Sequence, residues 1–225
     1  MASTPYNLIR SKRKTLTLQI AEGKLIVRAP LRLPKYEIDR FVASKTKWIE
    51  DKLAQSRERL EQRETFSLTY GKTVLFRGQE HTIAAKGGRA AGISGNTIYM
   101  PPGLDSDEIK DVCKKLYRHL AKEYISKRAE EFSRQMNVFP SGIRITSAKT
   151  RWGSCSSKKS MNFSWLLLMA DDDAIDYVIV HELAHILEMN HSKKFWAIVE
   201  NILPDYRRRQ TSLKKLQRRL AAEDW

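Results

Sequence analysis

The chain has 225 residues, of which 41% are hydrophobic, so it can bury one large core or two small ones. It carries 41 Lys and Arg against 26 Asp and Glu, a net charge of +15, which excludes an acidic disordered protein and favours anionic partners such as nucleic acid or nucleotides. Two cysteines, Cys113 and Cys155, are too few for a disulfide-stapled fold, and no apolar run approaches the ~20 residues that span a bilayer, so we expect a cytoplasmic protein.

The first 64 residues predict a β-hairpin followed by one long helix. Apolar and polar residues alternate over 7–30, and Glu22-Gly23 interrupts this alternation as a turn would. Pro30 and Pro34 end the hairpin. From residue 35 to about 64 the apolar residues recur at helical spacing with charged residues between them.

The middle of the chain predicts short strands and a linker. Residues 66–85 and 93–100 have strand-like patterns separated by glycine-rich turns. Pro101-Pro102-Gly103 is the best candidate for a boundary between domains. We therefore expect a β-rich N-terminal region at 1–102, with one long helix, and a second region at 103–225.

The second region predicts a mixture of helices and strands. A long helix is expected over 105–136, with Asp105 or Ser106 as its N-terminal cap. Strands are expected at 143–148 and 162–169. Three more helices are expected at about 174–189, 193–202 and 206–222.

Three of the five histidines fall within eleven residues: His181, His185 and His191. On a helix, residues four apart share one face, so the imidazoles of His181 and His185 can bind one metal ion. Glu182 follows the first histidine and can reach a water molecule beside that ion. This H-E-x-x-H arrangement is typical of zinc hydrolases, in which three protein ligands leave a fourth position open.

The helix that carries these residues is apolar on nearly every side, which is typical of a buried helix. Imidazoles and a carboxylate inside such a helix are costly unless they have partners. A metal ion would be such a partner, so burial supports a metal site independently of the motif.

The third ligand has two candidates. Asn190 could act as a left-handed helix cap, which would turn the chain back and bring His191 towards the metal. Glu200 on the following helix is the alternative ligand. Glu188 shares a face with His185 but lies ~10.5 Å of helix rise beyond His181, which is too far for one ion.

A second feature is the segment Arg151–Ser156, which lies between two predicted strands. It is either a turn with a packed tryptophan or a loop that lines the cleft. An edge strand at Asn162–Trp165 could pair with an extended peptide. Cys155 belongs to no nucleophile–base pattern, so we expect no catalytic role for its thiol.

Several separated motifs are similar to those of one protein family. In the C-terminal half they are Arg151–Cys155, Asp176–His185, Asn190–Ser192 and Phe195-Trp196. In the N-terminal half they are Lys12–Lys14, Val27–Pro30 and Lys47–Ile49. Together they resemble the YgjP-like metallopeptidase family of bacteria, which is related to the SprT-like and WLM zincins.

The resemblance implies an α+β fold. In it, an N-terminal β-hairpin and helix region precedes a zincin-like core with an antiparallel or mixed sheet. It also implies that His181, His185 and His191 hold one zinc ion and that Glu182 is the general base. Some of the related zincins process proteins that are bound to DNA.

These observations predict a zinc-dependent hydrolase, most simply a metallopeptidase acting on a polypeptide. Candidate side chains that could bind the substrate or the transition state are Arg151, Tyr177 and Tyr206. One alternative is a nucleoside triphosphate pyrophosphohydrolase of the UTP type, which the resemblance also suggests and which could use Mg²⁺. Another is a DNA-associated scaffold with a structural zinc. In each case the basic ends of the chain, near Arg10–Lys14 and Arg207–Arg219, could contact a polyanion.

Overall fold

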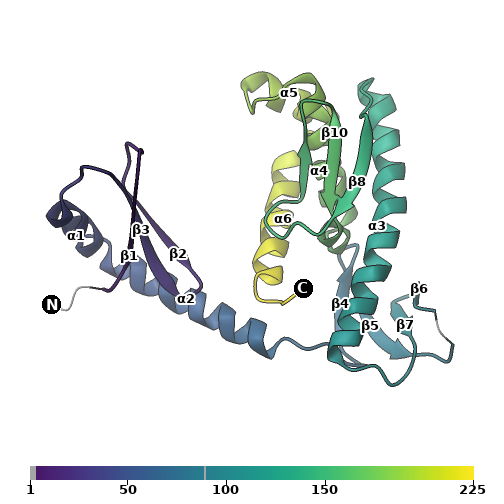
Figure 1. The fold of residues 1–225 in the computed structure, drawn as a ribbon. Helices are drawn as coiled ribbons and strands as arrows, with labels where there is room; N and C mark the ends of the chain where they lie inside the picture. Colours follow the sequence, from purple (N-terminus) through teal and green to yellow (C-terminus); the bar gives the residue numbers. More distant parts are fainter. Residues whose placement is uncertain (1–3, 89) are drawn as a thin grey trace. The chain divides into compact units, whose positions relative to one another are not determined.

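The computed structural model describes residues 4–88 and 90–225, and over these residues the chain has an α+β fold with three β-sheets (Figure 1). It divides into two compact units, residues 1–66 with 220–225 and residues 67–219. The boundary expected at Pro101–Gly103 falls inside the second unit, between a strand and a long helix.

The first unit contains the predicted hairpin and one additional strand. Its strands are β1 (Asn7–Ser11), β2 (Thr17–Ala21) and β3 (Lys24–Pro30), in the order β1-β3-β2. Strands β2 and β3 are antiparallel and are joined at Glu22-Gly23, where both residues have positive φ. Strand β1 pairs with β3 in parallel, so a three-stranded mixed sheet replaces an isolated hairpin.

The single long helix predicted after this sheet is wrong, because the segment forms two helices, α1 (Lys35–Ala43) and α2 (Thr46–Thr65). Lys45 between them has a non-helical backbone (φ −116°, ψ 15°). The Ser44 hydroxyl donates to the Phe41 carbonyl (2.7 Å), so it competes for groups that a continuous helix would use.

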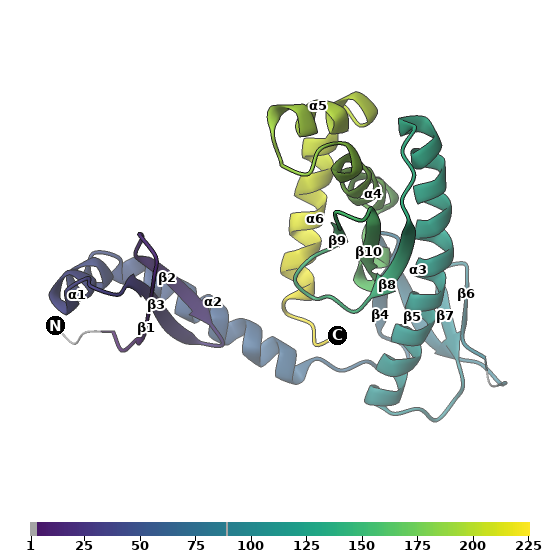
Figure 2. The same ribbon diagram turned by 45° about the horizontal axis from the view of Figure 1, so that its top comes forward.

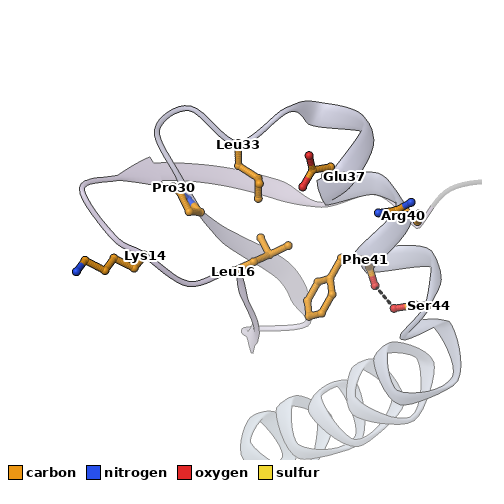
Figure 3. Close-up of a pocket in the computed structure, with 8 residues that line it drawn as sticks. All are labelled: Lys14, Leu16, Pro30, Leu33, Glu37, Arg40, Phe41 and Ser44. Atoms are coloured by element: carbon orange, nitrogen blue, oxygen red, sulfur yellow. Dashed lines mark hydrogen bonds between the residues drawn. The ribbon is translucent and has the colours of Figure 1, made fainter.

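The core of the first unit lies between the sheet and the two helices. Its fully buried members come from alternate positions of β3 and from one face of the helices: Leu25, Val27, Ala29, Ile38, Val42 and Ile49. A hollow of about 570 Å³ opens beside this core, with Leu16, Leu33 and Phe41 pointing into it (Figure 3). In the C-terminal segment, the ring of Trp225 packs 5.5 Å from that of Phe66.

The second unit begins with a four-stranded sheet. Its strands are β4 (Thr73–Phe76), β5 (Gln79–Ala85), β6 (Gly92–Ser94) and β7 (Thr97–Met100), in the order β4-β5-β7-β6. This agrees with the short strands expected from the sequence.

A long helix, α3 (Ser106–Met136), follows this sheet and has the predicted cap. The Asp105 carboxylate accepts from the backbone amides of Asp107 and Glu108, and Glu108 in turn accepts from the Asp105 amide. At the other end Asn137 adopts the left-handed conformation (φ 51°), which ends the helix.

The sheet beside the histidines has the order β8-β10-β9, formed by β8 (Gly142–Thr146), β9 (Gly153–Cys155) and β10 (Ser160–Ser164). The expectation that Asn162–Trp165 is an edge strand is wrong. Strand β10 is central, paired in parallel with β8 and antiparallel with β9. The edges of this sheet are β8 and β9.

The strand predicted to continue to Met169 ends at Ser164 and becomes a short 3₁₀ helix, Trp165–Met169. The Ser164 hydroxyl accepts from the backbone amide of Leu166 (3.3 Å) and starts this turn. All five residues of the turn are buried, and the turn packs against α3 and β4 rather than extending a strand.

Three helices complete the second unit: α4 (Asp172–Leu187), α5 (Lys193–Ile202) and α6 (Tyr206–Leu220). Figure 2 shows α3 beyond the β8 edge of the sheet and α6 beyond the β9 edge. Helix α4 packs against both α3 and β9 and is largely buried, as its apolar sequence predicts. No helix in the described part of the chain is both long and apolar enough to cross a membrane.

Candidate metal centre

The three clustered histidines lie together in space. His181 and His185 are one turn apart on α4, and each offers a ring nitrogen. These two nitrogens and one from His191 lie within 4.8 Å of one another. Among the described residues, these three histidines form the group of His, Cys, Asp or Glu side chains that lie close enough together to bind one metal ion.

His191 reaches the cluster by a different route from the one predicted. Asn190 is not left-handed. Helix α4 instead ends at Glu188, whose backbone is extended (φ −143°, ψ 108°). The chain then enters α5 through Ser192, whose hydroxyl accepts from the Phe195 amide. His191 Nε2 lies 3.0 Å from His181 Nε2, while the alternative third ligand, Glu200, is outside the cluster.

Hydrogen bonds behind the rings set the orientation of both helical histidines. His181 Nδ1 lies 3.4 Å from the Tyr177 hydroxyl, and His185 Nδ1 lies 3.2 Å from the Glu188 carbonyl oxygen. Because Nδ1 of each ring has a hydrogen-bond partner, Nε2 is the nitrogen that remains available to bind a metal ion. A partner on the second nitrogen is the usual arrangement for histidines that bind metals.

The surroundings favour neutral imidazoles. Burial, together with the neighbouring His185 and His191, lowers the pKa of His181 to about 3. Burial also lowers the pKa of His185. At neutral pH both rings therefore have a free lone pair, which a metal ligand requires.

Glu182 is 5% exposed and lies beside the histidine cluster on the same helix. Its Oε2 atom has no hydrogen-bond partner among the described residues. Burial raises the pKa of this carboxyl group to about 7, and the charge of Arg151 opposes the rise. A buried acceptor without a partner next to a cluster of three imidazoles fits a site for a divalent metal and water, and imidazole nitrogens suit zinc.

The Arg151–Ser156 segment contains a strand rather than only a turn. Gly153 in β9 approaches Glu182 so closely that a side chain there would meet the carboxylate. Arg151 is exposed, and the Trp152 carbonyl accepts from the Ser164 amide (2.8 Å), which joins this segment to β10. The Cys155 thiol is partly buried, which raises its pKa, and the charge of Glu182 raises it further.

The two candidate tyrosines stack on each other at the side of the cluster, with ring centroids 6.5 Å apart. The Tyr206 hydroxyl accepts from Arg207 Nε (3.3 Å) and not from a histidine. The Tyr177 hydroxyl accepts from Gln210 Nε2 (2.7 Å). Gln210 could not be predicted from the sequence, because it lies on a different helix and no motif connects it to the histidines.

The basic helix α6 uses several of its charges within the protein. Arg208 and Arg209 both pair with Asp173, at the start of α4, and with Asp205. Arg219 pairs with Glu80 at 2.6 Å. These ion pairs hold α6 in place. Fewer of its basic side chains are therefore available to bind a polyanion than the sequence suggests.

Comparison with known proteins supports the metallopeptidase resemblance. Residues 14–216 match the family described as YgjP-like, metallopeptidase domain. No curated protein matches the chain.

Two solved structures are similar to parts of the chain. One is the zymogen of the metallopeptidase abylysin from Pyrococcus abyssi, with 20% identity, 45% of this chain and 99% of that chain covered, and a TM-score of 0.38. The other is the zymogen of jannalysin from Methanocaldococcus jannaschii, with 28% identity, 41% and 94% covered, and a TM-score of 0.36. The family match, rather than these alignments, carries the assignment. Because that match covers most of its residues, the chain belongs to the YgjP-like metallopeptidase domain family.

Proposed function

We propose that the protein is a zinc-dependent peptidase in which His181, His185 and His191 hold the metal and Glu182 is the general base. The observation that carries the proposal is the convergence of three ring nitrogens within 4.8 Å, beside a buried carboxylate whose Oε2 has no partner among the described residues. Family membership supports hydrolysis of a peptide bond.

Zinc, when bound, supplies a Lewis acid that polarises a carbonyl group and acidifies water. The protein's own contribution begins with Glu182, which accepts a proton from the water that attacks the peptide carbonyl. The same carboxyl group then gives this proton to the leaving amine. Burial raises the pKa of Glu182 towards neutrality, which suits a group that must both accept and return a proton.

The edge of the β8-β10-β9 sheet supports a polypeptide substrate. Strand β9 pairs with β10 on one side, and within the described residues no strand pairs with its other side. An extended peptide can add to such an edge by backbone hydrogen bonds. Because Gly153 of β9 touches Glu182, a peptide on this edge would lie near the general base.

Purified full-length protein tests the proposal with two measurements, zinc content and cleavage of unfolded casein. We expect one zinc per chain in the wild type. Glu182→Gln should keep the zinc and lose about 10²–10⁴-fold in cleavage rate, the usual contribution of a general base. His185→Ala should lose both the zinc and the activity.

Glu200→Gln is the matched control, because Glu200 is an exposed glutamate outside the cluster. It should keep both zinc and activity, whereas loss of zinc would make it the third ligand. Full cleavage by Glu182→Gln would contradict the assignment of the base. Hydrolysis of a nucleoside triphosphate with casein left intact would favour the nucleotide alternative.

A further inference from the structure

The ring of His181 is held from behind by a tyrosine on its own helix. Tyr177 lies one turn before His181 on α4 and is 6% exposed. Its hydroxyl lies 3.4 Å from His181 Nδ1, the nitrogen that faces away from His191. The hydroxyl therefore contacts Nδ1 of His181, and a hydrogen bond at this atom influences which of the two ring nitrogens carries the proton.

The tyrosine is in turn held by helix α6. Gln210 Nε2 donates to the Tyr177 hydroxyl at 2.7 Å across 33 residues of sequence. The residue before it, Arg209, donates to the Asp173 backbone carbonyl (3.0 Å) and to the Asp205 carboxylate (2.7 Å). These bonds anchor α6 at the start of α4 and place Gln210 over the tyrosine.

A hydroxyl group suits this position because it both donates and accepts. With the Gln210 amide bound to the oxygen, the hydroxyl hydrogen and a second lone pair remain for His181. The hydroxyl can donate to Nδ1 when Nε2 carries the proton and faces His191 Nε2 at 3.0 Å. It can accept from Nδ1 when Nε2 presents its lone pair to a metal ion.

We propose that Tyr177 and Gln210 are positioning residues that hold the His181 ring in one orientation, with either nitrogen protonated, so that it is ready to bind metal. This inference rests on the proposed role of His181 as a ligand. Removing a partner behind a ligating histidine usually costs 10–100-fold in metal affinity. Helix α6 would thus act on the metal centre without touching the ion.

Three single variants separate positioning from packing. Tyr177→Phe keeps the ring and removes the hydroxyl, and Gln210→Leu keeps the size and removes the donor. Tyr206→Phe is the matched control, because Tyr206 belongs to the same aromatic stack but its hydroxyl contacts Arg207. All three full-length, metal-free proteins should unfold at about the wild-type temperature.

The first measurement is zinc affinity by competition with a chromophoric chelator. We expect Tyr177→Phe and Gln210→Leu to bind zinc about tenfold more weakly than the wild type, and Tyr206→Phe to bind it equally well. The second measurement is the ¹⁵N resonance of His181 Nδ1 in the metal-free protein. It should shift in Tyr177→Phe and Gln210→Leu and stay in place in Tyr206→Phe.

Wild-type affinity and an unshifted His181 resonance in Tyr177→Phe would overturn the inference and leave the proposed function intact. An equal loss of affinity in Tyr206→Phe would also overturn it, because the effect would then come from packing. A wild type that binds no zinc, with His181→Ala as reference, would overturn the proposed function. The resonance would then decide by itself whether Tyr177 and Gln210 hold the ring.

Discussion

A β-carbon at Gly153 would lie 2.6 Å from Oε1 of Glu182 and 2.7 Å from its Cγ. Ordinary contacts between such atoms are well above 3 Å, so only glycine lets β9 pass this close to the carboxylate. The glycine in the Arg151–Ser156 segment is therefore explained by space rather than by a turn, since its φ is not in the left-handed region.

Gly153→Ala should displace the Glu182 carboxylate and lower peptidase activity by about 10²-fold, towards the loss seen when a general base is removed. Zinc content should stay at the wild-type level, because the three histidines are not displaced. Casein cleavage and metal analysis check this expectation.

Gly142→Ala is the control for this change. Gly142 starts β8 in the same sheet, and a β-carbon there would meet nothing within 4 Å. It should keep full activity. Equal activity in both alanine variants would show that the carboxylate does not depend on the space at Gly153.

The ion pair between Arg128 of α3 and Asp176 of α4 should contribute strongly to stability. Arg128 donates through Nε (2.8 Å) and Nη2 (2.5 Å) to a carboxylate that is only 13% exposed. Arg128→Met leaves this carboxylate buried without its partner, so we expect a loss of about 3 kcal/mol in the free energy of unfolding, measured in urea.

The exposed pair Arg134–Glu130 provides the comparison, with both side chains about two-thirds exposed. Glu130→Ala should cost less than about 1 kcal/mol, because solvent screens the pair. The double variant Arg128→Met with Asp176→Leu should recover most of the loss, since it leaves no unpaired charge. A loss below 1 kcal/mol in Arg128→Met alone would contradict the burial argument.

The pair Arg77–Asp172 predicts a dependence of stability on pH. Hydrogen bonds from Arg77 hold the pKa of Asp172 below its usual range, although burial opposes this. The folded state therefore binds fewer protons than the unfolded state in acid. The stabilisation should be complete above the unfolded pKa of about 3.9 and be lost as the pH falls through the lower folded value.

Urea unfolding of the wild type and Arg77→Gln at several pH values measures this effect. Their difference in unfolding free energy should be constant near neutrality and shrink below about pH 4. Both side chains are partly exposed, at 39% and 47%, so the contribution should be under about 1 kcal/mol. If the difference in unfolding free energy stays constant in acid, or if it remains when Asp172 is replaced in Asp172→Asn, the pH dependence comes from a group other than Asp172.

The two thiols should differ in reactivity. Cys113 is fully buried, and burial raises its pKa to about 12, whereas Cys155 in β9 is partly exposed. With a thiol-reactive chromophore at neutral pH, we expect one thiol to react in the folded protein and the second only in denaturant. Cys155→Ser should remove the first phase, and two equally fast thiols would contradict the burial of Cys113.

Patterns that span a few residues were predictable from the sequence. The alternation around Glu22-Gly23 predicted the β2-β3 hairpin, the Asp105 cap predicted the start of α3, and the spacing of His181 and His185 placed two imidazoles on one helical face. Each depends on backbone hydrogen bonds and side-chain directions within one or two turns. The break between α1 and α2 is also local, but it involves the hydrogen bond from the Ser44 hydroxyl to the Phe41 carbonyl, and the spacing of apolar residues does not reveal such a bond.

The sequence by itself therefore determined the helix that carries His181, Glu182 and His185, together with the apolar character that buries it. Only the tertiary structure decided that β8 and β9 rather than β10 are the sheet edges, that His191 rather than Glu200 joins the cluster, and that Gln210 reaches Tyr177. These outcomes depend on how separate elements pack against one another. Packing brings together residues that are far apart in the sequence, and a pattern of a few neighbouring residues cannot predict such contacts.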